Sequence, residues 1–193
     1  NQWRQLPSLS KPRMLHASVC FDDCLYIIGG VDENDSPLES VEKLDLQSLQ
    51  WFSLPPMPRA LVNPLSVITS RGIFVIGGGV YGDSWVRGYV KSVMLFSFKE
   101  GKWLPRCPIP DECCSASAIS INQKIFVVGR GDRICLAYNT TTDTWTQLQR
   151  PQSEHLRGAT LVLNGRIVLC GGFTDDIEEY DPQRDAWKTW TLK

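Results

Sequence analysis

The sequence predicts an all-β protein made of four consecutive four-stranded units, and three repeated observations lead to this prediction. Four apolar runs end in glycine, a tryptophan follows each run, and turn residues separate the short apolar segments around them. Short strands joined by hairpin turns at regular spacing are typical of repeated β-sheets. The repeat therefore decides the fold class before any other feature of the sequence is considered.

The glycines mark the end of the second strand of each unit. The run before them, such as LYII (25–28) or IFVI (73–76), is continuously apolar, which favours a strand buried on both faces. A glycine pair permits a sharp turn where a Cβ atom would collide. The predicted structural glycines are Gly29, Gly30, Gly77, Gly78, Gly129, Gly171 and Gly172. In the third unit, Gly-Arg-Gly at 129–131 replaces the pair.

The tryptophans mark the outer, fourth strand of each unit. They are Trp51, Trp103, Trp145 and Trp187. We expect each large apolar ring to seal the gap to the next unit. The first strands are expected at 17–21, 65–69, 117–121 and 159–163, and the third strands at 41–46, 93–98, 134–139 and 177–182. Asn164-Gly165 separates two of these strands and is the strongest short hairpin signal.

One such unit cannot bury both of its faces, so stability requires stacked neighbours. The pattern therefore favours a β-propeller over a β-sandwich with incidental glycines. The whole chain, 1–193, is expected to be a single domain. Its blades are expected at about 12–54, 60–106, 112–150 and 155–193.

The N-terminal segment WRQLPSL (3–9) matches the tryptophan segments WFSLPPM (51–57) and WTQLQRP (145–151). Residues 1–11 are therefore expected to be one extra strand, the last strand of a preceding blade. Four blades and an extra strand predict a portion of a larger propeller. Closure of the four blades as one ring remains the alternative.

The paired glycines, the Tyr-Asp-Pro stretch at 180–182 and the tryptophan that follows resemble the kelch motif. The run Pro-Arg-x-x-His-Ala at 12–17 is similar to the start of a blade in BTB-kelch proteins. The resemblance covers residues 12–192, is strongest in the first and fourth units, and is weakened by a long loop at 79–92 and by the third unit's missing glycine.

This resemblance implies kelch-type blades, a six-bladed propeller and a protein-binding role. BTB-kelch proteins are commonly adaptors that present substrates to a cullin-type ubiquitin ligase, through domains that lie outside this segment. A cytoskeletal or scaffolding kelch protein is the alternative function. A fragment of a kelch-fold copper oxidase is a weaker one.

Composition excludes several other classes. The chain has 20 basic and 21 acidic side chains, a formal net charge of −1 and no run of like charge, so we expect no nucleic-acid partner. It has no apolar run of about 18 residues, so we expect no membrane span. No secretion signal is recognisable at the N-terminus, which favours a cytoplasmic protein.

Seven cysteines are too few and too irregularly spaced for a disulfide scaffold or a zinc site. We expect them to be reduced thiols, packed as small hydrophobic side chains in the apolar stretches around Cys20, Cys135 and Cys170. The two histidines, His16 and His155, fall in separate units, and no nucleophile elbow or phosphate loop is present. We therefore expect no metal, no cofactor and no enzymatic activity.

The loops are expected to bind a protein or peptide, because loops carry function where strands carry packing. Fourteen residues before the first glycine of each unit lie Leu15, Asn63, Ser115 and Arg157. In BTB-kelch relatives, polar residues at this position can face the substrate pocket, which favours Asn63, Ser115 and Arg157.

The loops after the glycines supply further candidates. Tyr81, Trp85 and Arg87 have the composition of an interaction hot spot. Arg130 and Arg133 can meet an acidic peptide, because Arg binds carboxylates bidentately. The alternative is that these arginines satisfy neighbouring loop carbonyls and Asp132.

Overall fold

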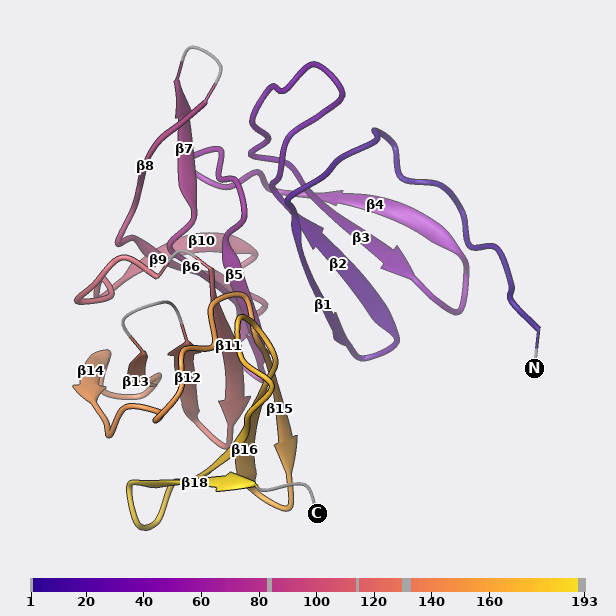
Figure 1. Cartoon of the computed structure of the whole chain (residues 1–193). Coiled ribbons are helices and arrows are strands. Elements are labelled where there is room, and N and C mark those ends of the chain that lie inside the picture. The colour runs from indigo at the N-terminus through magenta and orange to yellow at the C-terminus, as the bar shows by residue number, and fades with distance from the viewer. Residues whose placement is uncertain (1, 83–84, 114, 130–132, 191–193) are drawn as a thin grey trace. The chain divides into compact units, whose positions relative to one another are not determined.

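The chain is all-β, as predicted. The computed structural model describes residues 2–82, 85–113, 115–129 and 133–190, with the backbone alone at 81, 82 and 85–87. The described strands form four four-stranded antiparallel sheets and one two-stranded sheet (Figure 1). The chain divides into two compact units, residues 1–90 with 94–104 and residues 91–93 with 105–193.

The first unit contains two of the large sheets. One consists of β1 (Ala17–Phe21), β2 (Cys24–Ile28), β3 (Val41–Asp45) and β4 (Gln50–Leu54), in chain order. The other consists of β5 (Leu65–Thr69), β6 (Gly72–Ile76), β9 (Val93–Ser97) and β10 (Lys102–Arg106). Between β6 and β9 the chain forms a separate hairpin of β7 (Gly79–Gly82) and β8 (Trp85–Tyr89) (Figure 1). The predicted long loop at 79–92 is therefore largely a paired hairpin.

The second unit contains the other two large sheets. One consists of β11 (Ala116–Ile121), β12 (Lys124–Gly129), β13 (Ile134–Asn139) and β14 (Thr144–Gln147). The other consists of β15 (Ala159–Leu163), β16 (Arg166–Cys170), β17 (Ile177–Asp181) and β18 (Ala186–Trp190). In both sheets the strands follow chain order and pair antiparallel.

The two middle strands of each sheet supply most of the core. Every residue of β6 is buried, and so is every residue of β12 except Lys124. One apolar cluster lies in the first unit and includes Ile28, Val75 and Phe96. A separate cluster lies in the second unit and includes Phe126, Leu169 and Tyr180. The outer strands β4, β14 and β18 bury none of their residues completely.

The extra strand predicted over residues 1–11 is not formed. Residues 2–9 carry no strand and appear as a plain trace in Figure 1. The side chain of Trp3 is fully exposed. A strand requires a neighbour that exchanges backbone hydrogen bonds with it, and none of the described strands pairs with this segment.

The indole N–H of each repeat tryptophan bonds to the segment that precedes its own repeat, whereas the packing of the ring against the following unit stays a prediction. The indole N–H donates to a backbone carbonyl four residues beyond the preceding tryptophan position. The bonds are Trp51 to Pro7 at 3.1 Å, Trp103 to Pro55 at 2.9 Å, Trp145 to Cys107 at 2.9 Å and Trp187 to Gln149 at 2.8 Å. The acceptor of Trp51 is Pro7, in the N-terminal segment. This segment therefore takes the place that the end of an outer strand occupies in the other repeats, although it forms no strand.

In the second unit an aspartate strengthens this link. The Asp143 carboxylate accepts hydrogen bonds from the Cys107 backbone N–H at 2.8 Å and from the Tyr138 hydroxyl at 2.5 Å. In the following repeat, Asp185 accepts in the same way from the Gln149 N–H at 2.9 Å and the Tyr180 hydroxyl at 2.7 Å. Cys107 and Gln149 are thus each held by two hydrogen bonds, one at the backbone N–H and one at the carbonyl.

The first unit has no such aspartate, and it does not need one. Leu49 and Gly101 occupy the positions of Asp143 and Asp185, two residues before the tryptophan. The corresponding acceptors are Pro7 and Pro55. Proline has no backbone N–H to satisfy, so an aspartate opposite it would lack its backbone donor.

The glycine pairs are required by close approach as well as by backbone conformation. Gly30 and Gly172 have φ angles of 93° and 92°. A Cβ atom on Gly30 would lie 2.5 Å from the carbonyl oxygen of Met14, and one on Gly172 would lie 2.7 Å from that of Leu156. No larger residue fits at either position, because a Cβ would collide with backbone.

Candidate functional site

A buried ion pair fixes the segment that leads into the first sheet. Arg13 pairs with Glu42 on β3, and their side chains are only 1% and 6% exposed. The Arg13 guanidinium also donates to the carbonyls of Gly29 and Ser40, and Glu42 accepts from the Ser10 N–H. A buried charge is tolerated only when it is paired and hydrogen-bonded. This network therefore holds the chain two residues before Leu15.

The fourth repeat builds the same junction with histidine. His155 Nε2 lies 2.9 Å from Glu178 on β17, and Nδ1 lies 2.8 Å from the Gly171 carbonyl oxygen. Both side chains are fully buried. Glu178 also accepts from the backbone N–H groups of Gln152 at 2.8 Å and Ser153 at 3.0 Å. His155 therefore holds the chain two residues before Arg157, as Arg13 does before Leu15.

The middle repeats replace this network with apolar side chains. At the positions of Arg13 and Glu42, the second repeat has Leu61 and Met94, and the third has Cys113 and Leu136, all of them buried. At the position of Ser10 and Gln152, these repeats have proline, Pro58 and Pro110. Where the glutamate is absent, the N–H group at the position of Ser10 and Gln152 is absent too.

The four residues predicted from the glycine register share one unusual backbone conformation. Leu15, Asn63, Ser115 and Arg157 have φ angles of 55°, 49°, 59° and 61°. In the first unit the Asn63 N–H donates to the Leu15 carbonyl at 2.7 Å, and in the second unit the Arg157 N–H donates to the Ser115 carbonyl at 3.0 Å. Within each unit, the same position of two successive repeats is thus joined through the backbone.

Three of the four side chains at this position are exposed. Those of Leu15, Asn63 and Arg157 are exposed and that of Ser115 is half-buried. The Arg157 side chain makes no hydrogen bond or ion pair within the described part of the chain. The backbone of these left-handed residues is already ordered by hydrogen bonds. A backbone that is ordered before binding loses less entropy when a partner binds.

The remaining predicted residues lie in the loops after the glycines. Tyr81, Trp85 and Arg87 fall in the β7–β8 hairpin, whose register shifts between Val80 and Tyr81; their side chains lie outside the described set. Arg130 lies outside the described residues altogether. Arg133 is exposed and donates to the carbonyl of Gln152 at 2.8 Å.

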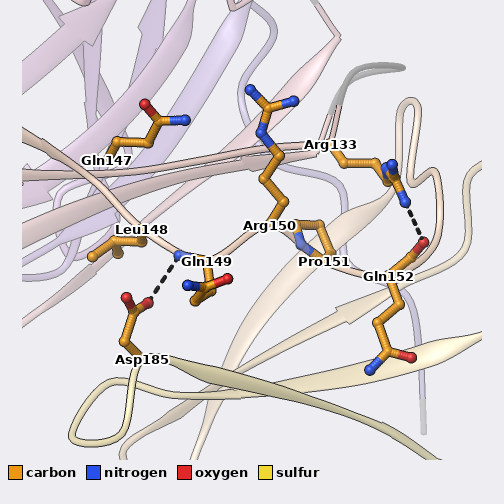
Figure 2. A pocket seen from close by; sticks show the side chains of 8 residues that line it. All are labelled: Arg133, Gln147, Leu148, Gln149, Arg150, Pro151, Gln152 and Asp185. Carbon is orange, nitrogen blue, oxygen red and sulfur yellow. Dashed lines mark hydrogen bonds between the residues drawn. The ribbon is translucent and has the colours of Figure 1, made fainter.

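Arg133 lines a groove in the second unit that sequence analysis did not anticipate. The groove has a volume of about 680 Å³. Figure 2 shows its lining residues, which are Arg133, Gln147, Leu148, Gln149, Arg150, Pro151, Gln152 and Asp185. Most of them belong to the segment between β14 and β15.

Phe173 is a second feature that the sequence did not reveal. Its side chain is 80% exposed, two residues after Gly171. The equivalent residue of the first repeat, Val31, is completely buried, since it pairs with Met14 and Pro37. An apolar residue after a glycine is expected to be buried, so the pattern alone held no signal for this exposure.

Burial shifts the pKa values of two titratable side chains, Cys135 and His16. Burial raises the pKa of the Cys135 thiol to about 12, which keeps this cysteine protonated and unreactive. Burial, followed by the charge of Arg13, lowers the pKa of His16, whose Nδ1 is buried and has no hydrogen-bond partner in the described structure. Cys20 corrects the expectation of a packed thiol, because it is exposed on β1.

Within the described ranges, no three His, Cys, Asp or Glu side chains gather as metal ligands. No helix in the described part of the chain is long and apolar enough to cross a membrane.

Comparison with known proteins gives a consistent result. A family model described as the kelch motif matches residues 12–58. Over 97% of the chain, it is 25% identical to Kelch-like protein 38 of Rattus norvegicus and 26% identical to Kelch repeat and BTB domain-containing protein 1 of Horsepox virus. Kelch-like protein 35 of Mus musculus is 28% identical over 94% of the chain.

The chain spans about one third of the length of these curated relatives, 33%, 35% and 32% respectively. A solved structure described as the structure of YjhT matches with a TM-score of 0.81 at 16% identity. The match covers 96% of this chain and 67% of that one. At this identity the likeness shows the fold, which is that of a β-propeller.

Proposed function

We propose that this chain, which is similar to the kelch-repeat domains of BTB-kelch proteins, recognises substrates for an adaptor of a cullin-type ubiquitin ligase. In this proposal the domain binds a protein or peptide and does not catalyse a reaction. The repeated left-handed position carries the proposal: Asn63, Ser115 and Arg157 present polar side chains from equivalent, backbone-anchored places in successive repeats.

The domain organisation forms part of the same proposal. The ranges 12–54, 60–106, 112–150 and 155–193 each contain one four-stranded sheet. We propose that these are four blades of one kelch domain within a six-bladed propeller, that the ligase is contacted through other domains, and that the protein acts in the cytoplasm.

Glycine variants test the binding position, since glycine adopts positive φ without strain. Arg157→Gly, Asn63→Gly and Ser115→Gly each delete the side chain and keep the backbone. Asn164→Gly is the matched control, because Asn164 is also exposed and left-handed, with a φ of 49°, but lies in the β15–β16 turn.

The measurement is quantitative affinity capture with the full-length protein in cells. We expect a set of partners whose recovery falls roughly tenfold or more in Arg157→Gly, as for loss of a hot-spot side chain, and is unchanged in Asn164→Gly. Cullin recovery should be equal in all variants. Identical partner sets in wild type and all three site variants would contradict the binding position, and absence of cullin from every capture would contradict the ligase role.

A further inference from the structure

A cavity of about 420 Å³ lies in the second unit, at the end of the sheets opposite their glycines. β12 begins at this end with Lys124 and runs to Gly129 at the other end. The described residues that line the cavity are Ile121, Asn122, Gln123, Lys124, Phe126, Asn139, Thr141, Thr142 and Pro182. The cavity volume falls within the range of about 300–1,000 Å³ typical of ligand sites.

In the first unit, an aromatic ring occupies the equivalent position. Phe98, the residue directly after β9, stacks on Phe21 of β1, with ring centroids 5.8 Å apart and an interplanar angle of 23°. Its centroid also lies 6.0 Å from that of Tyr26 and 6.3 Å from that of Phe96. Separations of about 4.5–7 Å are typical of attractive aromatic pairs. Four rings thus pack together at this end of the first unit.

The second unit keeps two of these four rings and replaces the other two. The rings that it keeps are those of Phe126 and Tyr180, with centroids 6.2 Å apart. The residue that ends β11 is Ile121 rather than a phenylalanine, and the residue directly after β17 is Pro182 rather than a phenylalanine. Both replacements line the cavity. The cavity therefore lies where the first unit holds a phenyl ring.

The rim of this position also differs in charge between the two units. In the first unit, the rim positions carry three carboxylates, those of Asp22, Asp23 and Asp45. In the second unit, the same three positions carry amides, those of Asn122, Gln123 and Asn139. Lys124, which follows two of these amides, is exposed and makes no hydrogen bond or ion pair within the described part of the chain.

No unpaired carboxylate offsets this lysine among the described residues of the lining, which include no Asp or Glu. Asp181, the residue before Pro182, is paired with Arg166 at 3.5 Å and with Arg184 at 3.9 Å. The rim therefore favours an anionic ligand over a cationic one.

The rim amides have hydrogen-bond donors to offer, because their oxygen atoms are used within the turns. The Asn139 side-chain oxygen accepts from the backbone N–H groups of Thr141 at 2.9 Å and Thr142 at 3.3 Å. The Gln123 side-chain oxygen accepts from the Thr141 hydroxyl at 3.0 Å. Each amide keeps its NH₂ group as a donor, which the aspartates of the first repeat lack.

We propose that this cavity binds a small aromatic carboxylate, with its ring against Phe126 and its carboxylate paired with Lys124. The ring takes the place that the Phe98 ring has in the first unit, and the rim amides donate to the carboxylate. A carboxylate carries one charge for one lysine, whereas a phosphate group would bring about two. The cavity lies at the other end of the sheets from Arg157, which precedes β15. The proposal thus goes beyond the proposed function and depends neither on a protein partner nor on a ligase.

Three small molecules separate the contributions of ring and charge. Phenylacetate has both, 2-phenylacetamide keeps the ring without the charge, and acetate keeps the charge without the ring. Each is titrated into the isotope-labelled 193-residue chain, and NMR reports which backbone amides respond. Residues 22–26 of the first unit provide an internal control in the same spectrum, because they hold the equivalent positions beside a ring that is already present.

Two pairs of variants test the residues. Pro182→Phe supplies the ring that the first unit has at this position, and Pro182→Ala is the matched control that leaves the cavity open. Lys124→Gln removes the charge of the rim, and Lys188→Gln is its control, because Lys188 is also exposed but lies on β18. If Pro182→Phe does not fold, the three small molecules and the lysine pair decide the outcome.

With phenylacetate, we expect shifts at residues 121–126 and 139–142 and a dissociation constant on the order of 1 mM. Lys124→Gln should weaken phenylacetate roughly threefold, and wild type should bind 2-phenylacetamide weaker by a similar factor. Acetate should not bind, and Pro182→Phe should abolish the response. Pro182→Ala and Lys188→Gln should bind as wild type does.

Three results would overturn the proposal: acetate or 2-phenylacetamide binding as well as phenylacetate, equal shifts at residues 22–26, or undiminished binding by folded Pro182→Phe. A blocked peptide ending in phenylalanine that binds more than roughly tenfold tighter than phenylacetate would assign the cavity to a protein terminus and overturn the small-molecule ligand.

Discussion

Two residues before each repeat tryptophan, the backbone is left-handed in all four repeats. The residues are Leu49, Gly101, Asp143 and Asp185, with φ angles of 59°, 65°, 57° and 48°. Glycine adopts this conformation without strain, and aspartate tolerates it because its short side chain bonds locally. Leucine has neither property, so Leu49 is the one position of the four where the side chain conflicts with the backbone.

We therefore predict that Leu49→Asn raises the free energy of unfolding by about 0.5–1 kcal/mol, because asparagine relieves part of the left-handed strain. Leu46→Asn is the control, since Leu46 is exposed in the same turn but does not have a positive φ. Urea denaturation of both variants gives the comparison. A Leu49→Asn variant no more stable than Leu46→Asn would contradict the strain argument.

At the scale of the elements, the junction before each sheet exists in two chemically consistent forms. One form has Gln152, His155 and Glu178, and the other has Pro58, Leu61 and Met94. In the first form the Gln152 N–H has its carboxylate acceptor, and in the second form both are absent. Glu178 also accepts from the Ser153 N–H, a donor that both forms retain. A mixture of the two leaves a buried group unpaired.

This consistency predicts a non-additive effect of substitution. His155→Leu alone should cost about 1–3 kcal/mol, because it leaves the fully buried Glu178 without its hydrogen-bond partner, His155 Nε2. The triple variant Gln152→Pro, His155→Leu, Glu178→Met copies the second repeat and should recover most of this loss. Chemical denaturation measures both variants. A triple variant as unstable as the single one would show that the two forms of the junction are not equivalent.

The elements also show where sequence reasoning succeeded. The strands 17–21, 65–69 and 159–163 were predicted to the residue, since turn residues directly follow each of them. The hairpin within 79–92 was missed, although its valine, tyrosine and tryptophan favour a strand. The excess of residues between glycine and tryptophan suggested a loop instead.

The candidate site could be predicted only in part, for a related reason. The glycine register identified four equivalent positions, but not that Leu15 and Arg157 are left-handed. The pairing of Arg13 with Glu42 joins residues far apart in sequence, which a local pattern does not reveal. The direction of each tryptophan bond also depends on where the preceding repeat lies, which becomes visible only in three dimensions.

At the scale of the whole molecule, burial varies strongly between strands of the same repeat type. All residues of β6 and β9 are buried, and five of six in β12 and in β13. In β15, by contrast, no residue is fully buried, and Leu161, Val162 and Leu163 are 43%, 41% and 45% exposed. Strands with few buried contacts open at low free energy.

We accordingly predict a graded pattern of amide hydrogen exchange in the 193-residue chain. Amides of β6, β9, β12 and β13 should exchange slowest, and those of β15, β18 and residues 2–9 fastest. Mass spectrometry of proteolytic fragments resolves these segments. Protection of β15 equal to that of β12 would contradict the expected ordering.

The proline and aspartate junctions have a consequence for how such chains diversify by recombination. A repeat ending in Pro55 suits a successor with Gly101, whereas one ending in Gln149 suits a successor with Asp185. Shuffling would place an aspartate opposite a proline, or a backbone N–H opposite a glycine, and either mismatch costs a hydrogen bond. Duplicated repeats are therefore not freely exchangeable. Each repeat requires a neighbour whose residue at this contact, proline or a residue with a backbone N–H, matches its own glycine or aspartate.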